Sequence, residues 1–88
     1  MAIQGADIQQ LRDLSNKFKS EAGNLSTLIG HLQSATSSSD GYWKGPAADR
    51  FRSEWSQLKP TFDKFVQTLH DAEKSASTSA DNVEAATR

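Results

Sequence analysis

The chain has 88 residues, 35% of them hydrophobic, with 10 Lys or Arg against 11 Asp or Glu and a formal net charge of −1. This length allows at most one small domain, whose core is marginal unless a partner adds to it. The mixed charge shows no basic stripe of the kind that nucleic-acid binders carry, and the lack of cysteine excludes disulfides and thiolate metal sites.

We expect neither a membrane-spanning helix nor a cleavable signal peptide. No apolar run approaches the ~20 residues that cross a bilayer. The first residues, Met1 to Asp7, contain neither basic residues nor an apolar stretch, so we expect no cleavable signal peptide. If the protein is exported, we expect another route to carry it.

The first predicted helix covers about residues 7–36. Asp7 and Gln10 have the spacing of a capping box, in which the two side chains satisfy free N–H groups of the first turn. Apolar or small residues then recur in steps of three and four, which is one helical face sustained over several heptads. These residues are Ile8, Leu11, Ser15, Phe18, Ala22, Leu25, Ile29 and Leu32. The Ser-rich segment 34–40 competes for backbone hydrogen bonds and predicts a loop.

Residues 37–45 are predicted to form a corner. Gly41 and Gly45 allow the chain to reverse, because glycine adopts left-handed backbone without a Cβ clash. Pro46 suits the first turn of the helix that follows. Trp43 lies between the glycines and offers a large ring that could close the end of a helical hairpin.

The second predicted helix covers about residues 46–75 and continues the same spacing. Its apolar positions are Ala48, Phe51, Trp55, Leu58, Phe62, Phe65, Leu69 and Ala72. Pro60 removes one backbone hydrogen bond, so we expect a kink there rather than an end, since the spacing continues in phase. Beyond it, residues 76–88 are expected to fray, because small side chains bury too little surface to offset the cost of ordering them.

Two long amphipathic helices joined by a short corner lie antiparallel. The predicted fold is therefore all-α, an antiparallel helix-turn-helix hairpin within a single domain, 1–88. Leu14, Leu28 and Val66 widen the apolar face, so we expect two hairpins to dimerise into a four-helix bundle. The alternative is a monomeric hairpin with some exposed apolar residues. The predicted core and dimer seam consists of Leu11, Phe18, Leu25, Ile29, Leu32, Phe51, Trp55, Leu58, Phe62, Phe65 and Leu69.

The sequence Trp43-Lys44-Gly45 falls between the two arms, and with it the whole chain resembles the WXG or ESAT-6-like family of type VII secretion. The resemblance implies a small protein that passes through the cytoplasm and is secreted without a cleavable signal. It implies two kinds of partner, which are itself or a second WXG-type hairpin, and the ATPase of the secretion system. It also implies that Trp43 and Gly45 form a corner element presented beside the partner's tail.

The family's Tyr-x-x-x-Asp/Glu export signal after the second helix has no counterpart here, since the only tyrosine is Tyr42. The nearest pattern of a hydrophobic residue followed by an acidic one is Leu69 with Glu73. Three alternatives follow. A partner hairpin supplies the signal, the Leu69–Glu73 pattern suffices, or the protein stays in the cytosol as a helper of an exported partner.

The sequence offers no group of residues suited to catalysis. His31 and His70 lie far apart along the two arms, with no second imidazole at ligand spacing, so we expect no enzyme, cofactor or metal. We expect no membrane interaction either, because interfacial helices are rich in Lys and Arg on their polar face.

The predicted function is thus a dimerising secreted protein that acts through protein–protein contacts. The alternative is a cytosolic helical adaptor or chaperone for a larger exported effector. Homodimer and heterodimer both stay open at this point.

Overall fold

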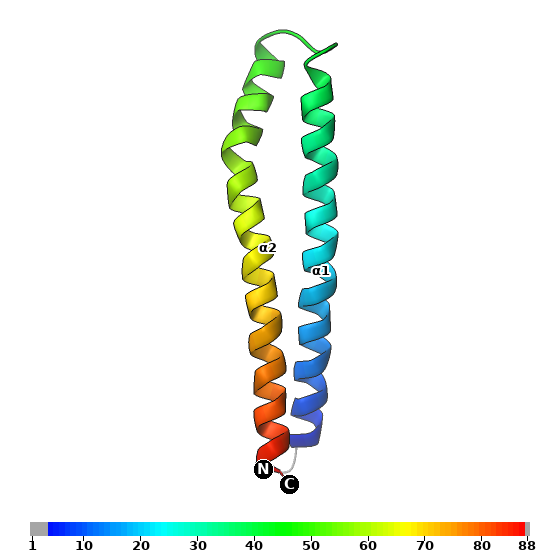
Figure 1. The fold of residues 1–88 in the computed structure, drawn as a ribbon, viewed down its shortest axis with the longest axis vertical. Coiled ribbons are helices and arrows are strands. Elements are labelled where there is room, and N and C mark those ends of the chain that lie inside the picture. Colours follow the sequence, from blue (N-terminus) through cyan, green and yellow to red (C-terminus); the bar gives the residue numbers. More distant parts are fainter. Residues whose placement is uncertain (1–3, 88) are drawn as a thin grey trace.

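Two long helices packed side by side make up the structure, a computed structural model that describes residues 4–87. Helix α1 covers Gln4–Ser39 and helix α2 covers Pro46–Ala86. They run antiparallel, so the start of α1 and the end of α2 lie at the end opposite the corner (Figure 1). The molecule measures 64 × 16 × 15 Å, and α2 alone spans most of that length at about 1.5 Å per residue. The predicted all-α hairpin is confirmed.

The first helix extends beyond its predicted bounds at both ends. Asp7 lies within the first turn of α1 rather than before it, so it does not act as the predicted cap. At the other end the serine run is helical as far as Ser39. Thr36 and Ser39 are buried there, and the Ser39 hydroxyl donates to the Thr36 carbonyl at 2.6 Å. Because this bond lies within the helix, the hydroxyl does not open it, and the corner shortens to residues 40–45.

The tail expected to fray is also helical in the structure, where α2 continues to Ala86. Ala76 and Ala80 are buried, so their small side chains let the two helices approach closely instead of leaving the tail unpacked. Arg12 joins the helix ends, with Nη2 3.1 Å from the Asp81 carboxylate and 2.9 Å from that of Glu84. The close packing of the helices and this ion pair therefore keep the tail helical, although its side chains are small.

The line of contact between the helices, here called the inner line, changes character along the molecule. From the middle of the molecule to the end opposite the corner, its buried residues are small, namely Ser15, Ala22, Ala76 and Ala80. Near the corner they include the larger Ile29 and Trp55. The Trp55 indole N–H donates to the Gln33 side chain at 2.8 Å, and its ring lies 6.1 Å from that of Phe62. Trp55 is therefore the main aromatic anchor between α1 and α2.

Pro60 lies inside α2 without ending it. The helix bends in this region, in the green-to-yellow part of Figure 1. This is the expected consequence of a residue that has no N–H and whose ring crowds the preceding turn.

The close approach near the chain ends predicts that Ala80 tolerates no larger side chain. Ala80→Leu should lower the free energy of unfolding by about 1–3 kcal/mol, because overpacking forces the helices apart. Ala85→Leu, on an exposed position of the same helix, is the matched control and should change it by less than ~0.5 kcal/mol. Urea unfolding followed by circular dichroism measures both. Equal effects would mean that the helices are not closely packed at Ala80.

Candidate functional site

The corner depends on the backbone conformation of Gly45. Its φ of 112° and ψ of 174° lie in a region open essentially to glycine alone. Among residues 4–87 it is the only residue with a positive φ, so Gly41, the other glycine predicted to allow the reversal, does not need one. The Gly45 carbonyl accepts from the Asp49 N–H at 3.0 Å, and Pro46 follows in the first turn of α2. The reversal of the chain is thus completed at Gly45.

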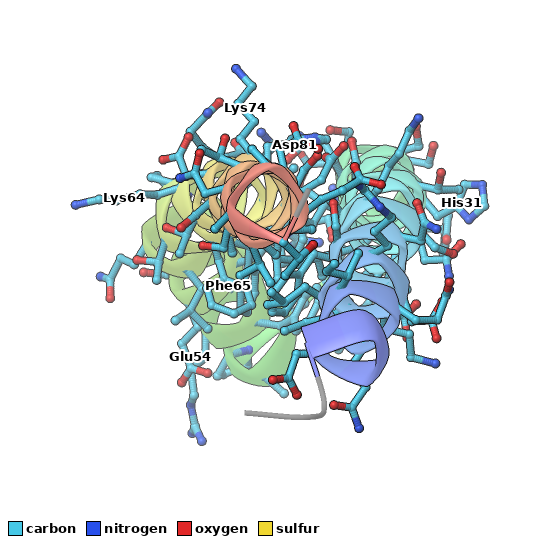
Figure 2. The ribbon with its side chains drawn as sticks, turned by 90° about the horizontal axis from the view of Figure 1, so that it is seen from below. His31, Glu54, Lys64, Phe65, Lys74 and Asp81 are labelled. Carbon is cyan, nitrogen blue, oxygen red and sulfur yellow. The ribbon has the colours of Figure 1, made fainter. Side chains whose placement is uncertain are left out.

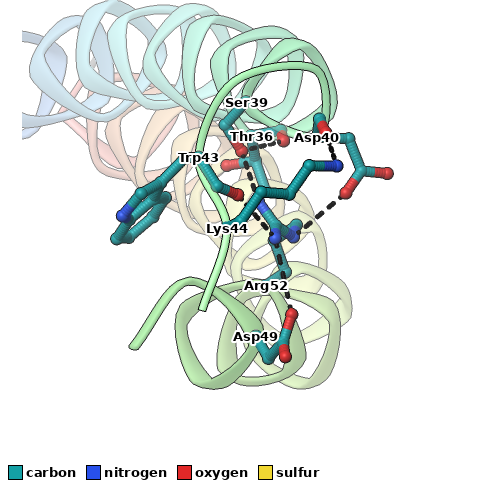
Figure 3. Close-up of polar contacts among 7 residues, drawn as sticks. All are labelled: Thr36, Ser39, Asp40, Trp43, Lys44, Asp49 and Arg52. Carbon is teal, nitrogen blue, oxygen red and sulfur yellow. Dashed lines mark hydrogen bonds and ion pairs between the residues drawn. The ribbon is translucent and has the colours of Figure 1, made fainter. Parts of the chain in front are cut away.

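Arg52 ties the corner together from the side of α2 (Figure 3). Its guanidinium donates to the Ser39 hydroxyl at 2.9 Å and to the Trp43 carbonyl at 3.0 Å. It also pairs with the carboxylates of Asp40 at 3.3 Å and Asp49 at 3.5 Å. The side chain is only 19% exposed, and its planar fork suits several acceptors at once. Arg52 therefore connects the end of α1, the corner and the first turns of α2.

Nothing in the spacing of the sequence points to Arg52. Its acceptors are a serine, two aspartates and a main-chain carbonyl, spread over residues 39–49. Only the fold brings them around one guanidinium. The feature of the sequence that could have indicated its role is the pair of carboxylates, Asp40 and Asp49, on either side of the corner.

The Trp43 ring lies outside this polar cluster and points away from it (Figure 3). It packs against Phe51, with ring centroids 5.8 Å apart, and the Arg52 guanidinium lies 5.9 Å from its centroid. The ring is 39% exposed, so it covers the first turns of α2 instead of sealing the end of the hairpin. A large part of the indole is left for another molecule to contact.

One side of the hairpin carries most of its exposed large apolar residues, here called the apolar face. Phe65 lies on this side, whereas Lys74 and Asp81 lie on the opposite side (Figure 2). Phe51, Leu58 and Phe65 follow one another at seven-residue intervals along α2, which keeps them on one helical face. The full set is Leu14, Leu28, Leu32, Phe51, Leu58 and Phe65, each between 39% and 53% exposed.

A shallow apolar groove on the same side separates the two helices. Its volume is about 190 Å³, and it is lined by Leu25, Leu28, Ile29, Leu32, Trp55 and Phe62. Grooves of this kind between helices accept apolar side chains of a partner. The apolar face therefore has both protruding side chains and a hollow to receive others.

The predicted seam divides into two surfaces in the structure. Ile29 and Trp55 are buried between the helices, and Leu11, Phe18, Leu25, Phe62 and Leu69 are half-buried there. The remaining seam residues, Leu32, Phe51, Leu58 and Phe65, are exposed on the apolar face. Heptad spacing identifies all of them as residues of an apolar helical face. It does not tell which of them are buried between α1 and α2 and which stay exposed, because that depends on how the two helices pack.

The Leu69–Glu73 pattern lies in the middle of α2 and is packed toward α1. Leu69 is half-buried, and the Glu73 carbonyl accepts from the Ser15 hydroxyl at 2.9 Å. The Glu73 carboxylate is 3.4 Å from the ring of His70. A receptor would reach these residues less easily than residues of a free tail.

The two histidines do not come together. His31 is exposed and points outward from α1 (Figure 2), and His70 lies on α2 next to Glu73. Within the part of the chain that the structure describes, no three His, Cys, Asp or Glu side chains are grouped as a metal site. Neither described helix is long and apolar enough to cross a membrane.

Comparison with known proteins agrees with this geometry. The family model WXG100, described as proteins of 100 residues with WXG, matches residues 5–87. The type VII secretion system extracellular protein A of Staphylococcus aureus, strains USA300 and Newman, is 25% identical over 84 residues, which cover 96% of this chain and 87% of the relative.

A solved structure gives the same fold. Geobacillus thermodenitrificans EsxA, crystal form I, superposes with a TM-score of 0.84 over 91% of this chain and 88% of that chain. Its sequence is 24% identical. This likeness supports the long helical hairpin.

The corner geometry predicts opposite effects for two glycine substitutions. Gly45→Ala should lower the free energy of unfolding by about 1–3 kcal/mol, because its backbone conformation strains any residue with a Cβ. Gly23→Ala is the control, since a Cβ there meets nothing within 4 Å. It should raise stability by roughly 0.8–1 kcal/mol through helix propensity. Thermal unfolding measures both, and a neutral Gly45→Ala would mean that the corner adopts another conformation.

Proposed function

The chain belongs to the WXG100 family, and we propose that it is a small non-enzymatic protein, secreted by a type VII system, that acts by pairing with a second hairpin. Membership of the family confirms the resemblance carried by Trp43-Lys44-Gly45. The relatives named as extracellular proteins of a type VII secretion system support the route of export. The observation that carries the pairing is the apolar face.

A hairpin has one layer of contact, whereas stable domains are built from packed layers around a core. Here the inner line holds mainly small residues, while Phe51, Leu58 and Phe65 remain about half exposed. Exposed apolar patches of this kind mark interaction sites. A second hairpin laid on the apolar face would complete a four-helix bundle and bury these side chains.

The partner in this proposal is a second copy of the chain or another WXG-type hairpin. By helical spacing, charges of both signs are expected at the rim of the face. Lys17 and Glu21 lie three and seven residues after Leu14 on α1, and Glu54 lies three residues after Phe51 and four after Arg50 on α2. A rim of mixed charge opposes neither self-association nor a different partner. The oligomeric state of the purified chain distinguishes the two.

Export in this proposal uses the corner. The partly exposed Trp43 ring, held on Phe51 and Arg52, is a rigid apolar element at one tip of the molecule. The secretion ATPase would read it together with a tail signal. The packing of Leu69 and Glu73 toward α1 favours a tail signal supplied by another chain of the exported complex.

The proposed dimer predicts a mass in solution of twice the 9.6 kDa of the chain. Phe65→Gln should raise the dissociation constant roughly 10–100-fold, because a two-fold dimer loses the burial of the half-exposed ring twice, at about 1 kcal/mol each. Lys74→Gln places the same residue on the opposite face and should leave the dimer intact. Light scattering after size exclusion measures this. A folded monomer of the unsubstituted chain would contradict pairing with itself and direct the search to another hairpin.

The proposed role of the corner predicts that Trp43→Ala lowers export without dissociating the dimer. The substitution removes the exposed ring and, of the apolar face, alters only the surroundings of Phe51, so the other side chains of the face remain available for pairing. Tyr42→Ala is the control, since Tyr42 is the neighbouring residue and 76% exposed. Immunoblots of medium and cells from a strain with a type VII system measure the secreted fraction. If Trp43→Ala were secreted as well as the unsubstituted chain, the ring would serve only the structure of the corner.

A further inference from the structure

The apolar face does not lie at the middle of the hairpin, as the register of the two helices shows. The Ser15 hydroxyl bonds to the Glu73 carbonyl, and the Trp55 indole bonds to the Gln33 side chain. In each of these pairs the two residue numbers add up to 88. A residue of α1 therefore lies about level with the α2 residue whose number is 88 minus its own.

On this scale the apolar face extends from Phe51 on α2 to Leu14 on α1, which lies level with position 74 of α2. The centre of the face is thus near position 62. The centre of α2, which covers Pro46–Ala86, is position 66. The face is displaced toward the corner by about four residues, or ~6 Å along the helix.

The end opposite the corner offers a partner helix little to pack against. Beyond Phe65, the positions that continue the face at seven-residue intervals hold only small residues, namely Ala72, Ser79 and Ala86. Seven residues before Leu14 on α1 lies the charged Asp7. The apolar contact offered to a second hairpin therefore stops well before the end of α2.

We infer that two copies of the chain pair antiparallel through the apolar face in a staggered register, with a two-fold axis near position 62. The inference rests on the proposed function, in which the corner of one chain is read together with the tail of another. Because corner and tail lie at opposite ends of a hairpin, this requires an antiparallel pair. The two faces then overlap fully only when the axis passes through their common centre.

The apolar groove between the helices fits this register. Its lining residues lie level with positions 55–63 of α2. An axis at position 62 brings Phe65, which is 52% exposed, against position 59 of the partner, at the middle of the groove. An axis at the middle of α2 would bring the same ring against position 67, outside the groove. The staggered register therefore places an exposed ring opposite a hollow.

The stagger leaves one end of each copy uncovered. The start of the partner's α2 comes level with about position 78, so the last two turns of α2 extend past it by ~12 Å. This end carries Asp81 and Glu84, which pair with Arg12. Their side chains and that of Arg12 are between 36% and 64% exposed in the hairpin. The dimer thus keeps a charged helical end accessible beyond the corner of the other copy.

Spin labels on single cysteines can measure the register, because the chain has no cysteine of its own. Ser53→Cys, Lys64→Cys and Asp71→Cys place labels at three exposed positions of α2. The second and third positions follow the first by about three and five full turns, so all labels project from the same side. Electron–electron double resonance then gives the distance between the two labels of each dimer.

The staggered dimer predicts equal distances for the labels at positions 53 and 71, which lie nine residues on either side of the axis. The separation along the helices should be about 27 Å for each, and only about 6 Å for the label at position 64. Each labelled chain should keep the mass of a dimer in light scattering. Adding Phe65→Gln to the chain labelled at position 64 should weaken the dipolar signal, since it weakens pairing through the apolar face.

The other outcomes separate a wrong register from a wrong function. Separations along the helices of about 39 Å at position 53 and about 15 Å at position 71 would place the axis at the middle of α2 and overturn the stagger alone. Equal distances at all three positions would indicate a parallel pair and contradict the arrangement of corner and tail as well. A monomer would overturn pairing of the chain with itself. A signal unchanged by Phe65→Gln would mean that the copies pair through another surface.

Discussion

The constraint on which the structure depends is that two helices alone cannot bury aromatic side chains on both sides of their contact. Ala22, Ala76 and Ala80 are fully or almost fully buried, whereas Phe51 and Phe65 are 39% and 52% exposed. Each half-exposed ring or leucine still has on the order of 1 kcal/mol to gain from burial. Summed over the apolar face, that gain approaches the whole stability of a small domain, roughly 5–15 kcal/mol. Association and folding of this chain are therefore expected to be closely linked.

The corner satisfies a different requirement, which is to turn the chain without losing the helix ends. Gly45 supplies a backbone conformation that other residues avoid, and Arg52 supplies donors for the Ser39 hydroxyl and the Trp43 carbonyl. Because Arg52 already forms hydrogen bonds with these two groups, the Trp43 ring is free to face outward. The same arrangement thus explains both the rigidity of the turn and the exposure of its tryptophan.

Heptad spacing and the glycine–proline corner were enough to predict the hairpin, because both are local signals. The ends of the helices were not predictable in this way. Ser39 is buried at the end of α1, where its hydroxyl accepts from Arg52 of α2, and Ala80 is packed against α1 because small residues fit there. Both depend on a neighbouring helix that local propensity does not include. Arg52 escaped notice for the same reason, since its acceptors converge only after folding.

The residues of the predicted seam show most clearly what the sequence pattern does not predict. Trp55 and Leu58 both fit the three-four spacing of the seam, yet Trp55 is 6% exposed and Leu58 is 47% exposed. The difference follows from helical geometry, because a residue three positions further on is turned by about 300°. Trp55 therefore lies on the inner line and Leu58 lies outside it. Two helices share only one such line of contact, so the remaining apolar positions of α1 and α2 stay exposed and form the face suited to a second hairpin.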